Sequence, residues 1–544
     1  MTEAASRTLA LQSSEPRSSE VPCWILIAAI FVAAVAVTLR VSFDGALWYA
    51  QAVDVIAAPM TLLAVVLGMA LPGVGDIGIR AVAWISAQRF SFSFVALMAL
   101  PLIAAGTVFV VGMIPIAADE LVPIWQARLF ASFEVVAHYE QALIDAVIPP
   151  VSQGVFVLVS PQGEAMSVYW PGQALLLTPL VWLGVPWLIG PLFGALAIYF
   201  IGRLTSALVD RWTGVVAMVL AVASGQFLLM AMTPFPEGVH LALSAAFVWL
   251  IVLGRPQHFF LAGLVGGLAL ALKNPFPHFV FAMPWVIWLL MSPARRRNVL
   301  PLFLGYLPWL VMIAAWVALQ SQLAPPSVQD EGGFWVSKLS QLIQPPSGLI
   351  LVVRLVELLS AWSWSAPGLL VLAAIGWTRT TDVRLRLLGA SFVATVAGYL
   401  FFPDQQGLGY GARYFHPAWV ALPILGAAAL SMLRSPKVER LTFAACLLGL
   451  VLVLPAQLFY AHLLQQRQAA PTRALAAPGV DLYFVLFRGE NGVSETVLAN
   501  DLSGSGDVVL VSQGEARDQM VVDMLFPGSR LVTENEWGRG YARP

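Results

Sequence analysis

Residues 295–319 read RRRNVLPLFLGYLPWLVMIAAWVAL. The first three residues are arginines, and residues 299–319 contain no charged side chain. A helix needs about 20 mostly apolar residues to cross the hydrocarbon core of a bilayer, and Lys and Arg concentrate on the cytoplasmic side of such helices. The stretch therefore predicts a membrane-spanning helix that begins at the cytoplasmic face.

The rest of the 544-residue chain has the same character. Hydrophobic residues make up 59% of the sequence, charged residues make up 11%, and the mean hydropathy is +0.81. A soluble domain carries about 25% charged residues, so lipid must surround most of this chain. The net charge of −1 gives no reason to expect a nucleic-acid partner. The two cysteines, Cys23 and Cys446, exclude a disulfide scaffold and a cysteine-built metal site.

We predict an all-α polytopic membrane protein with about thirteen transmembrane helices. The predicted spans are residues 22–43, 52–71, 90–114, 187–203, 214–232, 238–254, 259–273, 278–292, 299–319, 349–377, 386–402, 417–433 and 441–461. Lys and Arg are more frequent in the N-terminal segment and in the loops that follow even-numbered spans. This bias predicts a cytoplasmic N-terminus, with residues 1–21 as a polar tail, and an extracytoplasmic C-terminus.

Three predicted outer segments are too long to be simple turns. Two are the loops 115–186 and 320–348, and the second of these contains a short amphipathic piece, 334–343. The third is the tail, in which a linker, 471–479, precedes apolar runs of strand length. The tail elements are predicted as strands at 482–487, 508–511 and 530–533 and a helix at 515–525. The last three form a βαβ unit, so residues 471–544 predict a small α/β domain that leans on the membrane domain for stability.

Five polar groups fall at the outer ends of different predicted spans. They are Asp119-Glu120, Tyr169-Trp170-Pro171-Gly172, Glu237 with His240, Lys273, and the turn 409–417 that contains Arg413. Each has an ordinary structural explanation, because acids cap helices, Pro-Gly forms turns, and Lys and Arg at a membrane edge reach toward headgroup water. All five groups are predicted on the same outer face of the membrane, so they can line one cavity. The acids and cations of such a cavity are suited to binding an anionic lipid and a hydroxyl acceptor.

The acidic pair opens an amphipathic stretch that ends at Phe130. Leu121, Trp125 and Leu129 recur every four residues and form one apolar stripe. Such a stripe suits a helix that lies on the membrane surface.

The order of these motifs resembles the GT-C superfamily of polytopic glycosyltransferases, especially the bacterial branch related to protein O-mannosyltransferases and lipid A aminoarabinose transferases. The matching pieces are the acidic pair followed by Gln126-Ala127-Arg128-Leu129-Phe130, the turn at Tyr169-Trp170-Pro171-Gly172, Gly267-Leu268-Ala269 with Lys273, and Gly411-Ala412-Arg413-Tyr414. The resemblance covers residues 90–461, so residues 22–89 form a two-helix N-terminal addition. In this chain Trp170 replaces a proline of the family's turn.

The resemblance implies transfer of a sugar from a polyprenyl-phosphate carrier to a hydroxyl of a glycan, lipid or protein acceptor. Transfer would invert the anomeric centre, on the periplasmic face of the bacterial inner membrane. Asp119 would be the general base, with Glu120 and Glu237 beside it. Lys273 and Arg413, with Arg128 behind them, would bind the donor phosphate. The implied substrate-binding residues are Tyr169, Trp170, His240, Tyr410, Tyr414 and His416. No cofactor is implied, and no metal ligand is assigned. The first outer loop lacks an Asp-x-Asp pair, as in the metal-independent members of the superfamily, but dependence on a divalent metal stays open.

Three other functions stay open from the sequence. One is a lipid-linked oligosaccharide flippase or transporter, although transporters usually place ionisable groups at mid-membrane and show internal repeats. The predicted spans are nearly free of charge and show no repeat. Another is a polysaccharide polymerase or ligase with a lipid-pyrophosphate donor, and the third is a membrane-anchored binding module that works through the α/β tail.

Overall fold

The computed structural model describes residues 46–324, 343–403, 409–486, 498, 500 and 507–544. The predicted cytoplasmic tail and the predicted span 22–43 therefore lie outside the described residues. Most of the predicted loop 320–348, with nearly all of its amphipathic piece, lies outside them as well.

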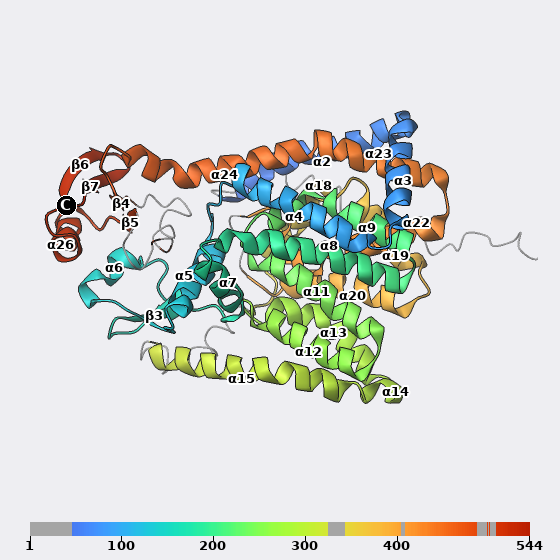
Figure 1. Ribbon diagram of the computed structural model, residues 1–544, viewed down its shortest axis with the longest axis horizontal. Helices are drawn as coiled ribbons and strands as arrows, with labels where there is room; N and C mark the ends of the chain where they lie inside the picture. The colour runs from blue at the N-terminus through green and yellow to red at the C-terminus, as the bar shows by residue number, and fades with distance from the viewer. Residues whose placement is uncertain (1–45, 325–342, 404–408, 487–497, 499, 501–506) are drawn as a thin grey trace, which may run out of the picture.

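A bundle of helices forms the bulk of the molecule (Figure 1). Its helices are α2 (Ala46–Ala70), α3 (Pro72–Ala87), α4 (Ser91–Phe109), α8 (Ile189–Leu208), α9 (Arg211–Val222), α10 (Gly225–Ala231), α11 (Pro236–Leu253), α12 (Pro256–Ala271), α13 (Phe276–Leu290), α14 (Pro293–Arg296), α15 (Val299–Leu323), α18 (Gly348–Ser363), α19 (Leu369–Arg379), α20 (Val383–Tyr399), α21 (His416–Trp419), α22 (Ala421–Leu433), α23 (Pro436–Leu452) and α24 (Leu454–Leu475). In the most apolar stretch of α11, 83% of the residues are buried within the protein. The corresponding share is only 22% for α4 and for α15. Thus α11 is central, while α4 and α15 present apolar side chains to lipid.

The predicted number of thirteen spans is not confirmed. Within the described residues, six helices are long and apolar enough to cross a membrane, or eight if each of two bent pairs counts as one span. Four further apolar helices are shorter, with 10–17 residues. The segment 72–89, which we predicted as a cytoplasmic loop, instead forms α3 over most of its length.

Several predicted spans are interrupted. The span 214–232 consists of α9 and α10, which meet at 74°, and the span 417–433 begins with a bent piece that meets α22 at 49°. The span 349–377 is divided into α18 and α19, and Gly368, with φ of 81°, lies at the break. These breaks bring backbone and polar side chains into the interior of the bundle. Such irregular backbone is tolerated at membrane depth only where protein or a water-filled cavity surrounds it.

An outer layer covers one end of the bundle. It comprises α5 (Ala118–Ala131), β1 (Ala137–His138), α6 (Ile144–Val147), β2 (Val157–Val159), β3 (Glu164–Ser167) and α7 (Gly172–Trp182). The strands form an antiparallel sheet in the order β1-β3-β2. The predicted stripe of Leu121, Trp125 and Leu129 is present on α5, but the prediction that it lies on the membrane surface is wrong. All three side chains are buried in a cluster with residues of this sheet and of the tail.

The C-terminal tail forms a second sheet at the same end of the molecule (Figure 1). Its elements are β4 (Leu482–Val485), β5 (Val508–Val511), α26 (Glu515–Leu525), β6 (Arg530–Asn535) and β7 (Gly538–Ala542), and the strand order is β5-β4-β7-β6. The predicted strands and helix are all present. The strands of the predicted βαβ unit, β5 and β6, lie on opposite edges, because β4 and the unpredicted β7 separate them. The first half of the predicted linker belongs instead to α24, which continues to Leu475.

Candidate active site

Asp119, in the first turn of α5, lies at the centre of a buried cluster of charges. Its Oδ2 is 2.7 Å from Nζ of Lys273 and 2.6 Å from Nη1 of Arg413. The hydroxyl of Tyr169 donates a hydrogen bond of 2.5 Å to Oδ1 of the same carboxylate. The carboxylate belongs to α5, and its partners belong to the end of α12, to the turn before α7, and to the segment before α21. Four residues that are distant in the sequence thus meet at one point.

The turn that carries Tyr169 is held against the end of α12. The backbone N–H of Trp170 donates to the carbonyl oxygen of Lys273 at 3.0 Å, and the indole N–H of Trp316 donates to the carbonyl oxygen of Tyr169 at 3.1 Å. A Cβ at Gly172 would lie 2.8 Å from the carbonyl oxygen of Ala271. Glycine therefore allows the two backbones to approach and places Tyr169 and Lys273 on the same carboxylate.

Arg413 follows a tight turn that is fixed by Gln226 of α10. The amide N–H of Ala412 donates to Oε1 of Gln226 at 2.8 Å, and Nε2 of Gln226 donates to the carbonyl oxygen of Tyr410 at 3.3 Å. Gly411 has φ of 54°, and a Cβ there would lie 2.0 Å from the same Oε1. The guanidinium of Arg413 then lies over the ring of Phe235, 4.8 Å from the ring centroid. Gln226 was not predicted from the sequence.

Glu237 adds a second carboxylate beside Lys273, with 3.7 Å between Oε1 and Nζ. Its other oxygen, Oε2, and both ring nitrogens of His240 are buried and have no hydrogen-bond partner among the described residues. A buried polar group without a partner is costly. These atoms therefore have hydrogen-bonding capacity that the described protein does not use.

The two members of the acidic pair differ electrostatically. Burial opposes ionisation of Asp119, but Lys273 and Arg413, together with the Tyr169 hydroxyl, outweigh it and hold the pKa of this carboxyl well below its usual range. For Glu120 burial is decisive and raises its pKa to about 8, although its Oε2 accepts a hydrogen bond of 2.8 Å from the N–H of Ile116. Adjacent carboxyl groups with separated pKa values are typical of functional sites.

A second buried ion pair lies next to the first and was missed from the sequence. Nη1 of Arg354 is 2.7 Å from Oε1 of Glu357, and its Nε and Nη2 donate to the carbonyl oxygens of Tyr399 and Phe402. The guanidinium groups of Arg354 and Arg413 both lie over the ring of Tyr414. They are 5.3 and 5.6 Å from the ring centroid, respectively. The sequence could have revealed this pair, because Arg354 and Glu357 are three residues apart inside an apolar run. Charged residues in such runs are usually paired with each other or functional.

The other predicted site residues lie around the cluster and make different contacts. Arg128 donates to the carbonyl oxygen of Asn500, 2.5 Å away, in the tail. Trp170 packs in an apolar cluster with residues of α15. His416 lies near Gln226 with 3.3 Å between Nδ1 and Nε2, and its ring stacks on Trp419. Tyr410 is fully buried, and its hydroxyl has no partner among the described residues. None of these four residues is an ion-pair partner of Asp119 in the described part of the chain.

An apolar cavity of about 310 Å³ adjoins α5. Its lining includes Leu121, Ile124 and Arg128 of α5, together with Trp187 and Pro234. The cavity therefore reaches from the base of the outer layer to the segment that leads into Glu237. Within the described ranges, no three His, Cys, Asp or Glu side chains gather closely enough to hold a metal ion.

No family model and no curated protein matches the sequence. Among solved structures, ArnT from Cupriavidus metallidurans bound to undecaprenyl phosphate superposes with a TM-score of 0.52 at 12% identity, covering 83% of this chain and 96% of that chain. The apo state of that ArnT gives a TM-score of 0.46 at 13% identity, covering 78% of this chain and 92% of that chain. The first superposition shows that this chain has the GT-C-like, polytopic all-α fold of ArnT, and it confirms the fold that the motifs predicted.

Proposed function

We propose that the protein is a membrane glycosyltransferase that moves a sugar from a polyprenyl-phosphate carrier to a hydroxyl acceptor. The observation that carries the proposal is the buried contact of Asp119 with Lys273 and Arg413, at 2.7 and 2.6 Å. An apolar cavity lies against another face of the same helix, where Leu121, Ile124 and Arg128 line it. A base, two cations and an apolar wall are the components that a lipid-phosphate leaving group and a hydroxyl nucleophile require. The shared fold with an ArnT that binds undecaprenyl phosphate supports the same donor class.

In this proposal, Lys273 and Arg413 bind the phosphate of the donor. Fixed cations stabilise the charge that develops on the phosphate as the bond to the sugar breaks. The phosphate competes with Asp119 for both cations, so donor binding frees the carboxylate. The pKa of Asp119 then rises from its depressed value toward that of an ordinary carboxyl, and Asp119 becomes a stronger base.

The chemical step is a single inverting displacement. The acceptor hydroxyl oxygen attacks the anomeric carbon, its proton passes to Asp119, and the bond between that carbon and the phosphate oxygen breaks. Polyprenyl phosphate leaves with the electron pair. Glu237 and His240 offer buried, unpartnered atoms among the described residues and orient the acceptor or sugar hydroxyls.

The remaining predicted residues take supporting roles in the proposal. Glu120 lies beside the base, and Tyr169 orients the Asp119 carboxylate and faces the sugar. Arg128 lines the apolar cavity and adds positive charge near the carrier lipid. Of the other predicted substrate-binding residues, Tyr410, Tyr414 and His416 support the segment that carries Arg413. Trp170 holds the turn of Tyr169 against Lys273. We further propose that the site opens to the periplasm, with the N-terminus in the cytoplasm and the tail outside the inner membrane.

Turnover by purified protein in detergent tests the proposal. The wild-type protein should convert at least one member of a panel of polyprenyl-phosphate sugars in the presence of an acceptor mixture. Loss of a general base costs about 10²–10⁴ in rate, so Asp119→Asn should abolish measurable transfer while native mass spectrometry still detects the bound donor. Lys273→Gln should lower kcat/KM by about 10²–10³ and should also weaken donor binding.

Lys437→Gln, an exposed substitution at the start of α23, is the matched control for loss of one positive charge. It should leave turnover and donor binding unchanged. Near-normal turnover by Asp119→Asn would refute the role of Asp119 as base. Failure of the wild-type protein to bind any polyprenyl phosphate would refute the donor class.

A further inference from the structure

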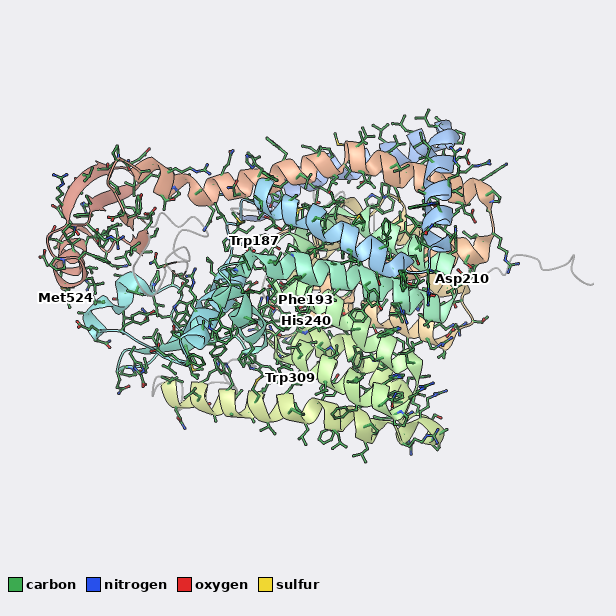
Figure 2. The ribbon with its side chains drawn as sticks, in the orientation of Figure 1. Trp187, Phe193, Asp210, His240, Trp309 and Met524 are labelled. Carbon is green, nitrogen blue, oxygen red and sulfur yellow. The ribbon has the colours of Figure 1, made fainter. Side chains whose placement is uncertain are left out.

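A hollow of about 390 Å³ lies at the end of the bundle opposite to Asp119. The start of α4, the ends of α8 and α11, and the start of α9 line it, and its polar and aromatic lining includes Arg89, Ser91, Tyr199, Arg203, Arg211 and Trp249. Glu237 and Leu253 belong to the first and last turns of α11, so about 24 Å of helix separates the two sites. Figure 2 shows Trp187 and Asp210 near opposite ends of α8.

The lining contains three arginines and no carboxylate. Within the described residues, none of Arg89, Arg203 and Arg211 lies within 4.0 Å of an Asp or Glu oxygen. Asp210 precedes Arg211, but its Oδ1 accepts hydrogen bonds from the backbone N–H and the hydroxyl of Thr213, at 2.8 and 2.9 Å. Asp210 therefore caps α9 instead of neutralising the hollow.

Two of these arginines are held in place by neighbouring side chains. The guanidinium of Arg203 lies over Trp249 and Tyr199, 5.4 and 5.9 Å from the ring centroids. Nε of Arg211 donates to Oγ of the buried Ser91 at 3.2 Å. These contacts fix positive charge around one space without cancelling it, and fixed donors around a cavity form an anion site.

A smaller hollow of about 170 Å³ at the same end of the bundle provides a contrast. Its lining contains two arginines, Arg295 and Arg384, and one of them, Arg384, is neutralised by Asp382 at 2.6 Å. A cationic side chain that only anchors a helix needs one route to headgroup water. Three arginines around one hollow repel one another, and no carboxylate of the described residues offsets this repulsion, so an anion in the hollow would be stabilised.

Exposed apolar side chains border the larger hollow. Phe90 is 68% exposed, and Phe94 and Leu97 continue an exposed apolar surface along α4. Because α4 has 19 residues and spans about 28 Å, the hollow lies near the level of lipid headgroups while this apolar surface runs toward the bilayer centre. We propose that the hollow binds the phosphate headgroup of an anionic phospholipid in the leaflet opposite to the Asp119 site, with its acyl chains along α4. Basic pockets between membrane helices recognise such headgroups.

Native mass spectrometry of the full-length protein with added dioleoylphosphatidylglycerol tests this proposal. Each arginine near an anionic lipid contributes about fivefold to affinity, so Arg203→Gln with Arg211→Gln should weaken phosphatidylglycerol binding about 25-fold. The matched control is Arg255→Gln with Arg297→Gln, which removes two exposed charges at the same end but outside the hollow. This control should change the affinity by less than about twofold. Neither pair should alter binding of dioleoylphosphatidylcholine.

Two results would overturn the proposal. Equal weakening by the pocket pair and by the control pair would show a general charge effect instead of a site. Displacement of the lipid by inorganic phosphate at equal concentration would show a site for free phosphate. If the pocket pair unfolds at a lower temperature than the wild type, Arg89→Gln replaces it, because Arg89 is exposed and its only described contact is with the ring of Phe90. This variant should weaken phosphatidylglycerol binding about fivefold, and an unchanged affinity would contradict the site.

Discussion

Asp119 and Glu120 are neighbours in the chain, but α5 turns their carboxyl groups into different surroundings. Asp119 meets two cations and a tyrosine hydroxyl, whereas Glu120 accepts a hydrogen bond from the N–H of Ile116 and is 1% exposed. Glu120 therefore keeps its proton near neutral pH while Asp119 is ionised. The pair therefore carries one negative charge, on Asp119, which contacts Lys273 and Arg413.

The raised pKa of Glu120 predicts a loss of stability as the pH rises. The unfolded chain ionises this carboxyl near its ordinary value of 4.5, whereas the folded protein ionises it only near 8. Between these values the unfolded state has the lower affinity for the proton, so ionisation favours unfolding. The wild type should therefore lose stability relative to Glu120→Gln between pH 5 and 8, by an amount on the order of a few kcal/mol. Thermal unfolding in detergent at several pH values measures the difference.

Glu140→Gln is the control for this titration, because Glu140 is exposed in the outer layer. Its melting temperature should follow that of the wild type across the same range of pH. A Glu120→Gln profile parallel to that of the wild type would show that Glu120 does not titrate in this range.

The sequence predicted the charged residues of the candidate cluster around Asp119 more completely than the residues that position them. Asp119, Glu237, Lys273 and Arg413 could be found because each lies at the outer end of a predicted span. Gln226 could not, because its role depends on Tyr410, which lies 184 residues further along the chain. The buried Asp54 was overlooked for the same reason, since its hydrogen-bond donors are on and just after α18.

At the scale of elements, hydrophobicity located the helices but not their breaks. The residues at the junction of α9 and α10 are Ala223 and Ser224, which do not lower the hydropathy of the surrounding window enough to mark a boundary. The same limit explains α5, because a stripe repeated every four residues fits a membrane surface and a protein surface equally well. The partner that covers the stripe comes partly from the tail, in the form of Leu498 and Val511.

The turn before Arg413 positions one of the two cations that contact Asp119. At Gly411→Ala, the positive φ costs about 1–2 kcal/mol, and the new Cβ would lie 2.0 Å from Oε1 of Gln226. The turn must therefore move, and Arg413 moves with it. We expect kcat/KM for the donor to fall by at least about tenfold, measured with the polyprenyl-phosphate sugar that the wild type uses.

Gly348→Ala is the matched control, because a Cβ at this position has no atom within 4 Å. It should leave kcat/KM unchanged. Normal donor kinetics of a folded Gly411→Ala protein would show that the position of Arg413 does not depend on this turn.

At the scale of the whole molecule, the two ends of the bundle differ in chemistry. The outer layer, the Asp119 cluster and the tail lie at one end, and the arginine-rich segment at α14 lies at the other (Figure 1). The distribution of Lys and Arg was sufficient to predict this polarity. The strand order of the tail was not predictable, because β4 pairs with β5 and β7 across distant parts of the chain. A pattern of apolar runs locates the strands, but it does not specify which strands pair with each other.

The way the tail is attached predicts what its removal would do. Leu143 and Ala146 of the outer layer share a core with the tail sheet, and Gln513 donates to the carbonyl oxygen of Asp145 at 3.2 Å. No tail residue is an ion-pair or hydrogen-bond partner of Asp119 within the described residues. A chain that ends at Leu475 should therefore melt at least about 5 °C lower but retain transfer within about tenfold of the wild type. Met524→Ala, at the exposed tip of the tail (Figure 2), should alter neither property. If the shortened chain kept its donor affinity but lost all transfer, the tail and not the membrane cluster would contain the working site.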